Sequence, residues 1–149
     1  LASIVNGCFG DYLSQRDNGL AIDMAFYQRN RPLPLTPEAL REAFPAPTNK
    51  LCVLVHGLCC HEGAWDYPDN PARSYGSALQ VDLGYTPFFL RYNTGLPIPY
   101  NGTALDALLE KLLAAYPVPV EELVLIGMIE TASGRSLSRQ PCMAGVRSG

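Results

Sequence analysis

A short apolar segment, Leu51-Cys52-Val53-Leu54-Val55-His56-Gly57-Leu58, most constrains what this chain can fold into. Its first five residues are all apolar, two of them are β-branched, and Asn49 precedes the run. A continuous apolar run of this length is typical of a strand buried on both faces, as in a parallel sheet covered by helices. Open α/β sheets bind their ligands outside the carboxyl ends of such strands. We therefore expect His56 and Gly57 to lie at the functional edge of a sheet.

The chain after this strand alternates between helical and extended patterns. Helices are predicted over 74–83, which Gly84 would end, and from Thr103 to Pro117, with leucines 105, 108, 109, 112 and 113 on one face. Strands are predicted over 86–92 and 123–126, and Gly127 follows the second of them. Right-handed crossovers between such strands give a parallel sheet with helices on both faces, so the predicted fold class is α/β.

The first 50 residues predict smaller elements. Apolar residues at helical spacing predict a helix over 3–13, although Gly7 and Gly10 weaken this pattern, and 17–19 is a predicted turn. Alternation over 22–27 predicts a half-exposed strand that turns at 29–32 into a hairpin. Thr36 before Pro37 has the chemistry of a helix start. Residues 58–73 are predicted to form a loop.

The composition and net charge of the chain exclude several classes of protein. A chain of 149 residues with 48% hydrophobic residues is predicted to be a single domain or a piece of one. A net charge of −3 gives no general attraction to nucleic acid. We expect no transmembrane segment and no signal peptide, although the chain begins at Leu1 and an upstream piece is expected to be missing. Five cysteines without regular spacing favour free thiols and a cytoplasmic location.

These features together resemble the α/β-hydrolase superfamily, specifically its bacterial lipase- and esterase-like members. The resemblance covers residues 1–127 and implies an incomplete α/β-hydrolase fold. The residues that carry it are Val53 to Leu58, Trp65, the segment Arg91-Tyr92-Asn93-Thr94-Gly95, and Leu123 to Gly127. In that family the backbone N–H of the residue after His-Gly, here Leu58, supplies half of the oxyanion hole. By the same resemblance Glu130, which follows the nucleophile position, would supply the other half.

The resemblance ends directly after Gly127. The family continues into a Gly-x-Ser-x-Gly turn that carries the nucleophilic serine. Here Ile129 occupies the serine position and Thr131 that of the closing glycine, and 132–149 contain no histidine, aspartate or glutamate. We therefore expect no intact catalytic residue. Residues 1–127 are interpreted as the N-terminal part of a hydrolase domain, and 128–149 as a divergent, disordered tail.

The abrupt change at residue 128 has a simple candidate origin. Our hypothesis is that the reading frame was lost near codon 128, which would make the chain a truncated hydrolase gene product. The strand that ends at Gly127 would then be an exposed sheet edge.

Other reactive side chains are given structural interpretations. His56 is interpreted as a loop-entry residue hydrogen-bonded to backbone, not as a catalytic base, because no serine stands in a matching position. Cys59, Cys60 and His61 could suggest a zinc site, but only Cys8 and Cys142 are left to supply its separated second ligand pair. A cysteine nucleophile at Cys59 or Cys60 would need a lowered pKa and a base, and we do not expect one. Ser133 lacks the connection from strand to glycine that a nucleophile turn needs. We expect no metal and no cofactor.

Two further residues are expected near the site, one in the loop after the buried strand and one at the end of the strand predicted over 86–92. Trp65 is interpreted as a packing residue under the loop, with a substrate platform as the alternative. Arg91 is expected either to pair with an acid in this loop, Glu62 or Asp66, and so brace the site, or to remain solvated.

By resemblance, the expected function is carboxylic ester hydrolysis by a serine, a histidine and an acid, acting on a small apolar ester or acyl ligand. This chain is expected to be an inactive form of such an enzyme. The alternative is a non-catalytic module of the same fold that binds an apolar ligand or a protein partner, which the sequence does not identify.

Overall fold

The computed structural model describes residues 2–15, 21–128 and 142–146 of the chain. Its helices are α1 (Ala2–Gln15), α2 (Pro37–Ala43), the short 3-10 helix η1 (Glu62–Trp65), α3 (Tyr75–Leu83) and α4 (Ile98–Ala115). The strands of the main sheet are β1 (Ala25–Gln28), β2 (Arg31–Pro32), β3 (Lys50–Val55), β6 (Thr86–Arg91), β7 (Glu122–Gly127) and β8 (Cys142–Val146). Strands β4 (Asp66–Tyr67) and β5 (Asn70–Ser74) form a separate hairpin.

The main sheet is mixed, with the strand order β2-β1-β6-β3-β7-β8. Its centre is parallel: Val53 of β3 lies opposite Phe88 of β6 on one side and Leu125 of β7 on the other. Strands β1, β2 and β8 run antiparallel to their neighbours. The predicted α/β class is confirmed, and the expectation of a parallel sheet holds for the three central strands alone.

Antiparallel pairing at the β1–β2 edge has a local cause. Arg29 and Asn30 join the two strands with φ angles of 50° and 62°. Two consecutive residues with positive φ form the tight hairpin turn whose twist matches the flanking strands. The predicted hairpin is confirmed, although β1 begins at Ala25, later than the alternation of side chains indicated.

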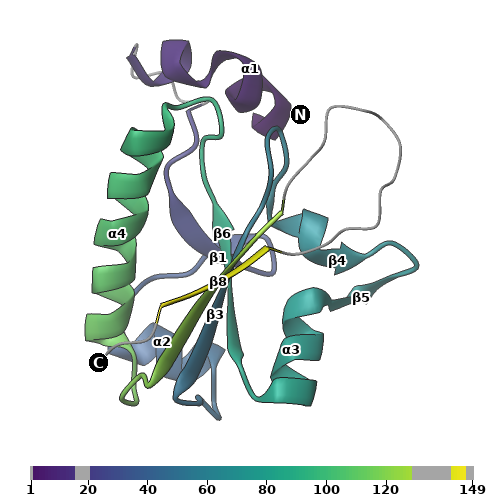
Figure 1. Cartoon of the computed structure of the whole chain (residues 1–149), viewed down its shortest axis with the longest axis vertical. Helices are drawn as coiled ribbons and strands as arrows, with labels where there is room; N and C mark the ends of the chain where they lie inside the picture. Colours follow the sequence, from purple (N-terminus) through teal and green to yellow (C-terminus); the bar gives the residue numbers. More distant parts are fainter. Residues whose placement is uncertain (1, 16–20, 129–141, 147–149) are drawn as a thin grey trace.

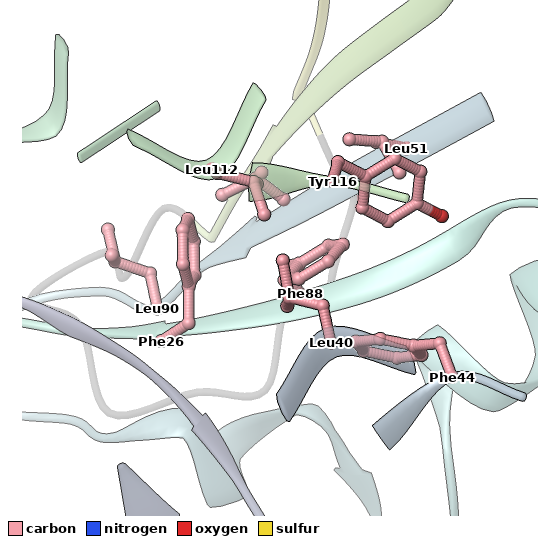
Figure 2. Close-up of a cluster of buried hydrophobic side chains, with 9 residues drawn as sticks. Phe26, Leu40, Phe44, Leu51, Phe88, Leu90, Leu112 and Tyr116 are labelled. Atoms are coloured by element: carbon pink, nitrogen blue, oxygen red, sulfur yellow. The ribbon is translucent and has the colours of Figure 1, made fainter. Parts of the chain in front are cut away.

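Helices cover both faces of the sheet, as predicted (Figure 1). On the face of α2 and α4, Phe88 lies at the centre of the larger core, with ring centroids 5.3 Å from Phe26 and 4.9 Å from Phe44 (Figure 2). Leu112 of α4 packs into the same cluster. The smaller core on the face of α3 and η1 contains Cys52, Leu54, Trp65, Val124 and Ile126. Strand β3 thus contributes to both cores, as its uninterrupted apolar run predicted.

Helix α4 begins five residues before the predicted start. Pro97 and Pro99 begin the helix from Ile98, and the Thr103 hydroxyl donates a hydrogen bond of 3.1 Å to the Pro99 carbonyl within the helix, so Thr103 is not a cap. Leu113 is exposed although it was placed on the apolar stripe. Eight residues advance a helix by about 80° beyond two full turns, which turns Leu113 away from the face of Leu105.

Two other segments differ from the sequence predictions. The predicted loop over 58–73 contains η1 and the β4–β5 hairpin. Within the predicted disordered tail, residues 142–146 form strand β8 against β7, so β7 is not the sheet edge. An open β7 edge presents backbone groups that a further strand can pair with, which explains this difference. The predicted turn at 17–19 and residues 129–141 lie outside the described residues. None of the described helices has the length and apolar character that crossing a membrane requires.

Candidate functional site

The carboxyl ends of β3 and β6 are held together by His56 and Tyr92. The backbone N–H of Tyr92 donates to Nε2 of His56 over 3.4 Å, and the Tyr92 hydroxyl donates to the His56 carbonyl over 3.0 Å. The two rings stack with centroids 4.6 Å apart. Because Nε2 accepts, Nδ1 carries the proton and donates to the Gly57 carbonyl at 3.0 Å. Both ring nitrogens are therefore engaged with backbone.

This arrangement confirms the structural interpretation of His56. The side chain is almost completely buried. Burial lowers the pKa of its imidazole from the ordinary value of 6.5, because the charged form is poorly solvated there. A neutral, buried imidazole whose two nitrogens are both hydrogen-bonded has no free nitrogen to act as a base. Its role is to fix the backbone at the end of the strand.

A tight turn follows Gly57 and presents the backbone of Leu58. The N–H of Cys60 donates to the Gly57 carbonyl over 3.2 Å and closes the turn. Cys59 adopts a φ of 59°, and its N–H donates to the Thr94 hydroxyl over 3.1 Å. Within the described part of the chain, the Leu58 N–H has no hydrogen-bond partner. Among the described residues, the turn thus leaves one backbone donor without a hydrogen bond at the carboxyl end of the central strand.

The ion pair of Arg91 and Glu62 braces this end of the sheet. Arg91, the last residue of β6, donates from Nε to Oε2 of Glu62 over 2.6 Å, and its Nη2 donates to Oε1 of the same carboxylate. Nη2 also donates to the Asn30 side chain over 2.7 Å, and the guanidinium lies 3.9 Å from the centroid of the Tyr27 ring. The predicted brace is confirmed with Glu62 as the acid, and it ties η1 and the β1–β2 turn to β6.

Trp65 has the packing role that the sequence predicted. It is buried in the smaller core and forms a T-shaped pair with Tyr75, with ring centroids 6.2 Å apart. Its indole N–H is buried without a hydrogen-bond partner among the described residues. A platform for substrate is therefore not its role in this structure.

Cys59, Cys60 and His61 do not assemble into a site of their own. His61 instead caps η1, because its Nδ1 accepts the Gly63 N–H over 3.1 Å. In residues 2–15, 21–128 and 142–146, no group of three or more histidine, cysteine, aspartate or glutamate side chains could hold a metal ion. The predicted positions Ile129, Glu130 and Ser133 lie outside the described residues.

Helix α1 packs over the turn at the candidate site, a contact that sequence reasoning missed. Gly7 lies directly against Cys59, and Gly10 lies against Asn93. The Asn93 side chain donates to the Gly10 carbonyl over 3.0 Å. A side chain at Gly7 or Gly10 would collide with these partners, so the two glycines permit the contact. The two glycines could have predicted this contact, because a glycine inside an apolar helical pattern indicates close packing.

Among the described residues, three cavities are lined without any contribution from Leu58. One of about 440 Å³ is lined by both apolar and polar residues, and the polar ones include Arg29, Asp66 and Glu62 of the Arg91–Glu62 pair. A second, of about 350 Å³, lies between α2, β1 and α3. The third, of about 540 Å³, is lined by apolar residues between the end of α4 and the start of β7.

Comparison with known proteins identified no relative. No family model matches the chain, and neither the search of curated proteins nor that of solved structures gave a match.

Proposed function

We propose that this chain carries the oxyanion-hole side of an α/β-hydrolase-type carboxylic ester hydrolase of the lipase or esterase class, without its nucleophile. The observation that carries this proposal is the Leu58 N–H after the end of β3, which has no hydrogen-bond partner among the residues that the structure describes. Acyl transfer places negative charge on a carbonyl oxygen, and a fixed backbone donor stabilises that charge. Gly57 has no side chain to obstruct a substrate that approaches this donor.

The register of the central strands supports the same proposal. Gly127 lies opposite Val55, and the N–H of Met128 donates to the Val55 carbonyl over 3.0 Å. Gly127 and Met128 therefore lie beside the start of the His56–Leu58 turn. A nucleophile turn after β7 would place its serine next to the Leu58 donor, which is the juxtaposition that ester hydrolysis requires.

The residues that follow β7 cannot perform the chemistry. Ile129, which stands in the serine position, has no nucleophilic atom. Loss of the nucleophile alone removes most of the rate in a serine hydrolase. We therefore propose an inactive form of the enzyme, whose ligand would be a small apolar ester or acyl group. We also propose a cytoplasmic location, because the five cysteines of the chain have no regular spacing of the kind a disulfide framework shows.

A p-nitrophenyl butyrate assay tests the missing nucleophile. We expect release of p-nitrophenol at the rate of the buffer alone, for the unchanged chain and for Ser133→Ala alike. Turnover that Ser133→Ala abolishes would show that a displaced serine acts as nucleophile and would contradict the proposal.

A non-catalytic binding module is the second candidate. The observation in its favour is that both faces of the central strands are already covered by packed helices. Such a module would unfold in a single cooperative transition on heating, whereas a hydrolase fragment with an incomplete core would melt over a broad range. Calorimetry separates the two.

A further inference from the structure

The cavity of about 440 Å³ lies where the β1–β2 turn meets η1, and its walls carry charges of both signs. Arg29 belongs to the turn, and Asp66 follows directly after η1. Both residues are exposed, so a ligand in the cavity can reach them. Glu62 lies in the same wall, but Arg91 donates to both of its carboxylate oxygens and neutralises its charge. Of the charged residues described in this wall, Arg29 and Asp66 therefore remain to pair with a ligand.

The Arg91–Glu62 pair also holds the two charged segments in place. Arg91 binds Glu62 of η1 and donates from Nη2 to the side chain of Asn30 over 2.7 Å. Asn30 is the neighbour of Arg29 in the turn, and Asp66 follows η1. The backbone beside each of the two charges is thus tied to the same guanidinium. A site whose parts are fixed before the ligand arrives loses less entropy on binding.

Two aromatic side chains give the same cavity an apolar part. Tyr27 of β1 and Phe89 of β6 are partners in the antiparallel ladder, so their side chains point to the same face of the sheet. Both also line the cavity of about 350 Å³, whose other walls include Leu33 and Phe44. Because the two cavities share these residues, they adjoin, and the charged end continues into an apolar end.

This combination favours a small ligand with one charge of each sign and an apolar part. Burial raises the pKa of Asp66 and the nearby Glu62 adds to the rise, so a cation beside this carboxylate would stabilise its charged form. A guanidinium such as that of Arg29 pairs with a carboxylate through two parallel hydrogen bonds. An amino group, a carboxylate and an apolar side chain occur together in amino acids and short peptides. Cavities of about 300–1,000 Å³ are typical of sites for small molecules.

We propose that the two cavities form one site for a short peptide with a free amino group, a free carboxylate and an apolar side chain. The amino group pairs with Asp66, the carboxylate pairs with Arg29, and the apolar side chain lies against Tyr27 and Phe89. Leu58 lines neither cavity, so the inference goes beyond the proposed hydrolase function and does not depend on it.

Titration with glycyl-L-phenylalanine tests the proposal, with binding followed through the backbone amide signals in two-dimensional NMR. N-acetylglycyl-L-phenylalanine lacks the ammonium group and glycyl-L-phenylalaninamide lacks the carboxylate, so each of these probes removes one of the two pairs. The test variants are Asp66→Asn and Arg29→Gln. The matched controls are Asp69→Asn and Arg31→Gln, at exposed residues that line neither cavity. The signal dispersion of the same spectra reports whether each variant is folded.

We expect the unchanged chain and both controls to bind the dipeptide with a Kd of about 1 mM. Each test variant should bind it about three- to tenfold more weakly, because one charged pair is lost. The acetylated probe should bind the unchanged chain more weakly by the same factor, and Asp66→Asn should weaken its binding no further. The amidated probe should behave in the same way toward Arg29→Gln.

Three results would overturn the proposal. They are absence of binding at about 20 mM dipeptide, equal affinity of the unchanged chain for all three probes, and equal losses in the test and control variants. Amide shifts that gather around Leu58 and leave β1 and η1 unchanged would place the ligand elsewhere and would also overturn it. The dipeptide contains no ester, so these outcomes are independent of any esterase activity.

Discussion

The ring of His56 stacks on that of Tyr92, and two hydrogen bonds between these residues join the carboxyl ends of β3 and β6. His56 and Tyr92 each follow directly after the end of a strand, and the two residues are far apart in sequence. It fixes the direction in which the chain leaves β3, and hence the position of the Leu58 N–H. The geometry of the candidate site therefore depends on a contact between side chains that play no chemical part in it.

The Tyr92 hydroxyl should contribute measurably to stability. Tyr92→Phe keeps the ring stacking but removes the donor to the buried His56 carbonyl, so we expect the free energy of unfolding to fall by about 1–2 kcal/mol. Urea denaturation measures the change. Tyr100→Phe, at an exposed tyrosine, should stay within about 0.5 kcal/mol of the unchanged chain. Equal effects of the two variants would contradict the assigned role of Tyr92.

The lowered pKa of His56 predicts a loss of stability in weak acid. Below the ordinary pKa of 6.5 the unfolded chain binds a proton at this residue more readily than the native protein does. The free energy of unfolding should therefore decrease as the pH falls from about 6.5 toward the native pKa, and this group should have no effect above that range. Burial and the nearby Glu62 raise the pKa of Asp66, which acts in the opposite direction at lower pH.

Proton NMR of the His56 ring tests the pH prediction directly. His61→Gln removes the other histidine and leaves one ring signal to follow. We expect the chemical shift of His56 to titrate with a midpoint below 6.5. A midpoint at or above that value would show that the ring is solvated or charged in the native protein.

The ion pair of Arg91 and Glu62 should have a larger coupling energy than an exposed ion pair of the same protein. Its side chains are 20% and 12% exposed, whereas those of the matched pair Lys50–Glu122 are 45% and 41% exposed. A double-mutant cycle with alanine should give a coupling energy of about 1–3 kcal/mol for Arg91–Glu62 and below about 0.5 kcal/mol for the exposed pair. Comparable values for both pairs would mean that Arg91 does not brace the site.

Two helical glycines should respond oppositely to alanine. A Cβ at Gly76 of α3 would lie 2.9 Å from atoms of both Leu54 and Pro87, so Gly76→Ala should destabilise by about 1–3 kcal/mol. Gly102 of α4 has open space around it, so Gly102→Ala should stabilise by about 0.5–1 kcal/mol through helix propensity. Thermal melts that shift in the same direction for both variants would contradict this account of α3 packing.

The strongest sequence signals were those in which one local cause decides the structure. The apolar run of β3 is buried on both faces, Thr36 caps α2 through its hydroxyl, and Gly84 ends α3 with a φ of 73°. In each case the residue's own chemistry determines the outcome. The Arg91–Glu62 brace was also predictable, because the end of β6 and the loop after β3 meet at one sheet edge.

The sequence predictions failed mainly where contacts between residues far apart in the sequence determine the structure. One exception is the early start of α4, which has a local cause: Pro97 and Pro99 begin the helix from Ile98, and the Asn101 side chain in its first turn donates to the Asn93 carbonyl of the preceding loop. The packing of α1 over the Leu58 turn depends on Cys59 and Asn93, which are far from it in sequence. A second exception is the β4–β5 hairpin, which has a local cause that the sequence analysis did not use. Pro68-Asp69 is a turn dipeptide between Tyr67 and its partner Asn70, and it could have predicted this turn.

The coding nucleotide sequence around codon 128 tests the central claim most directly. If the chain is a hydrolase scaffold whose nucleophile turn was lost through a change of frame, one of the two alternative frames reads Gly-x-Ser-x-Gly at the codons that follow Leu123-Val124-Leu125-Ile126. Histidine and acidic codons should follow further along that frame. If neither alternative frame encodes such a turn, residues 128–149 are the genuine continuation of this chain, and the assignment of a lost hydrolase active site is wrong.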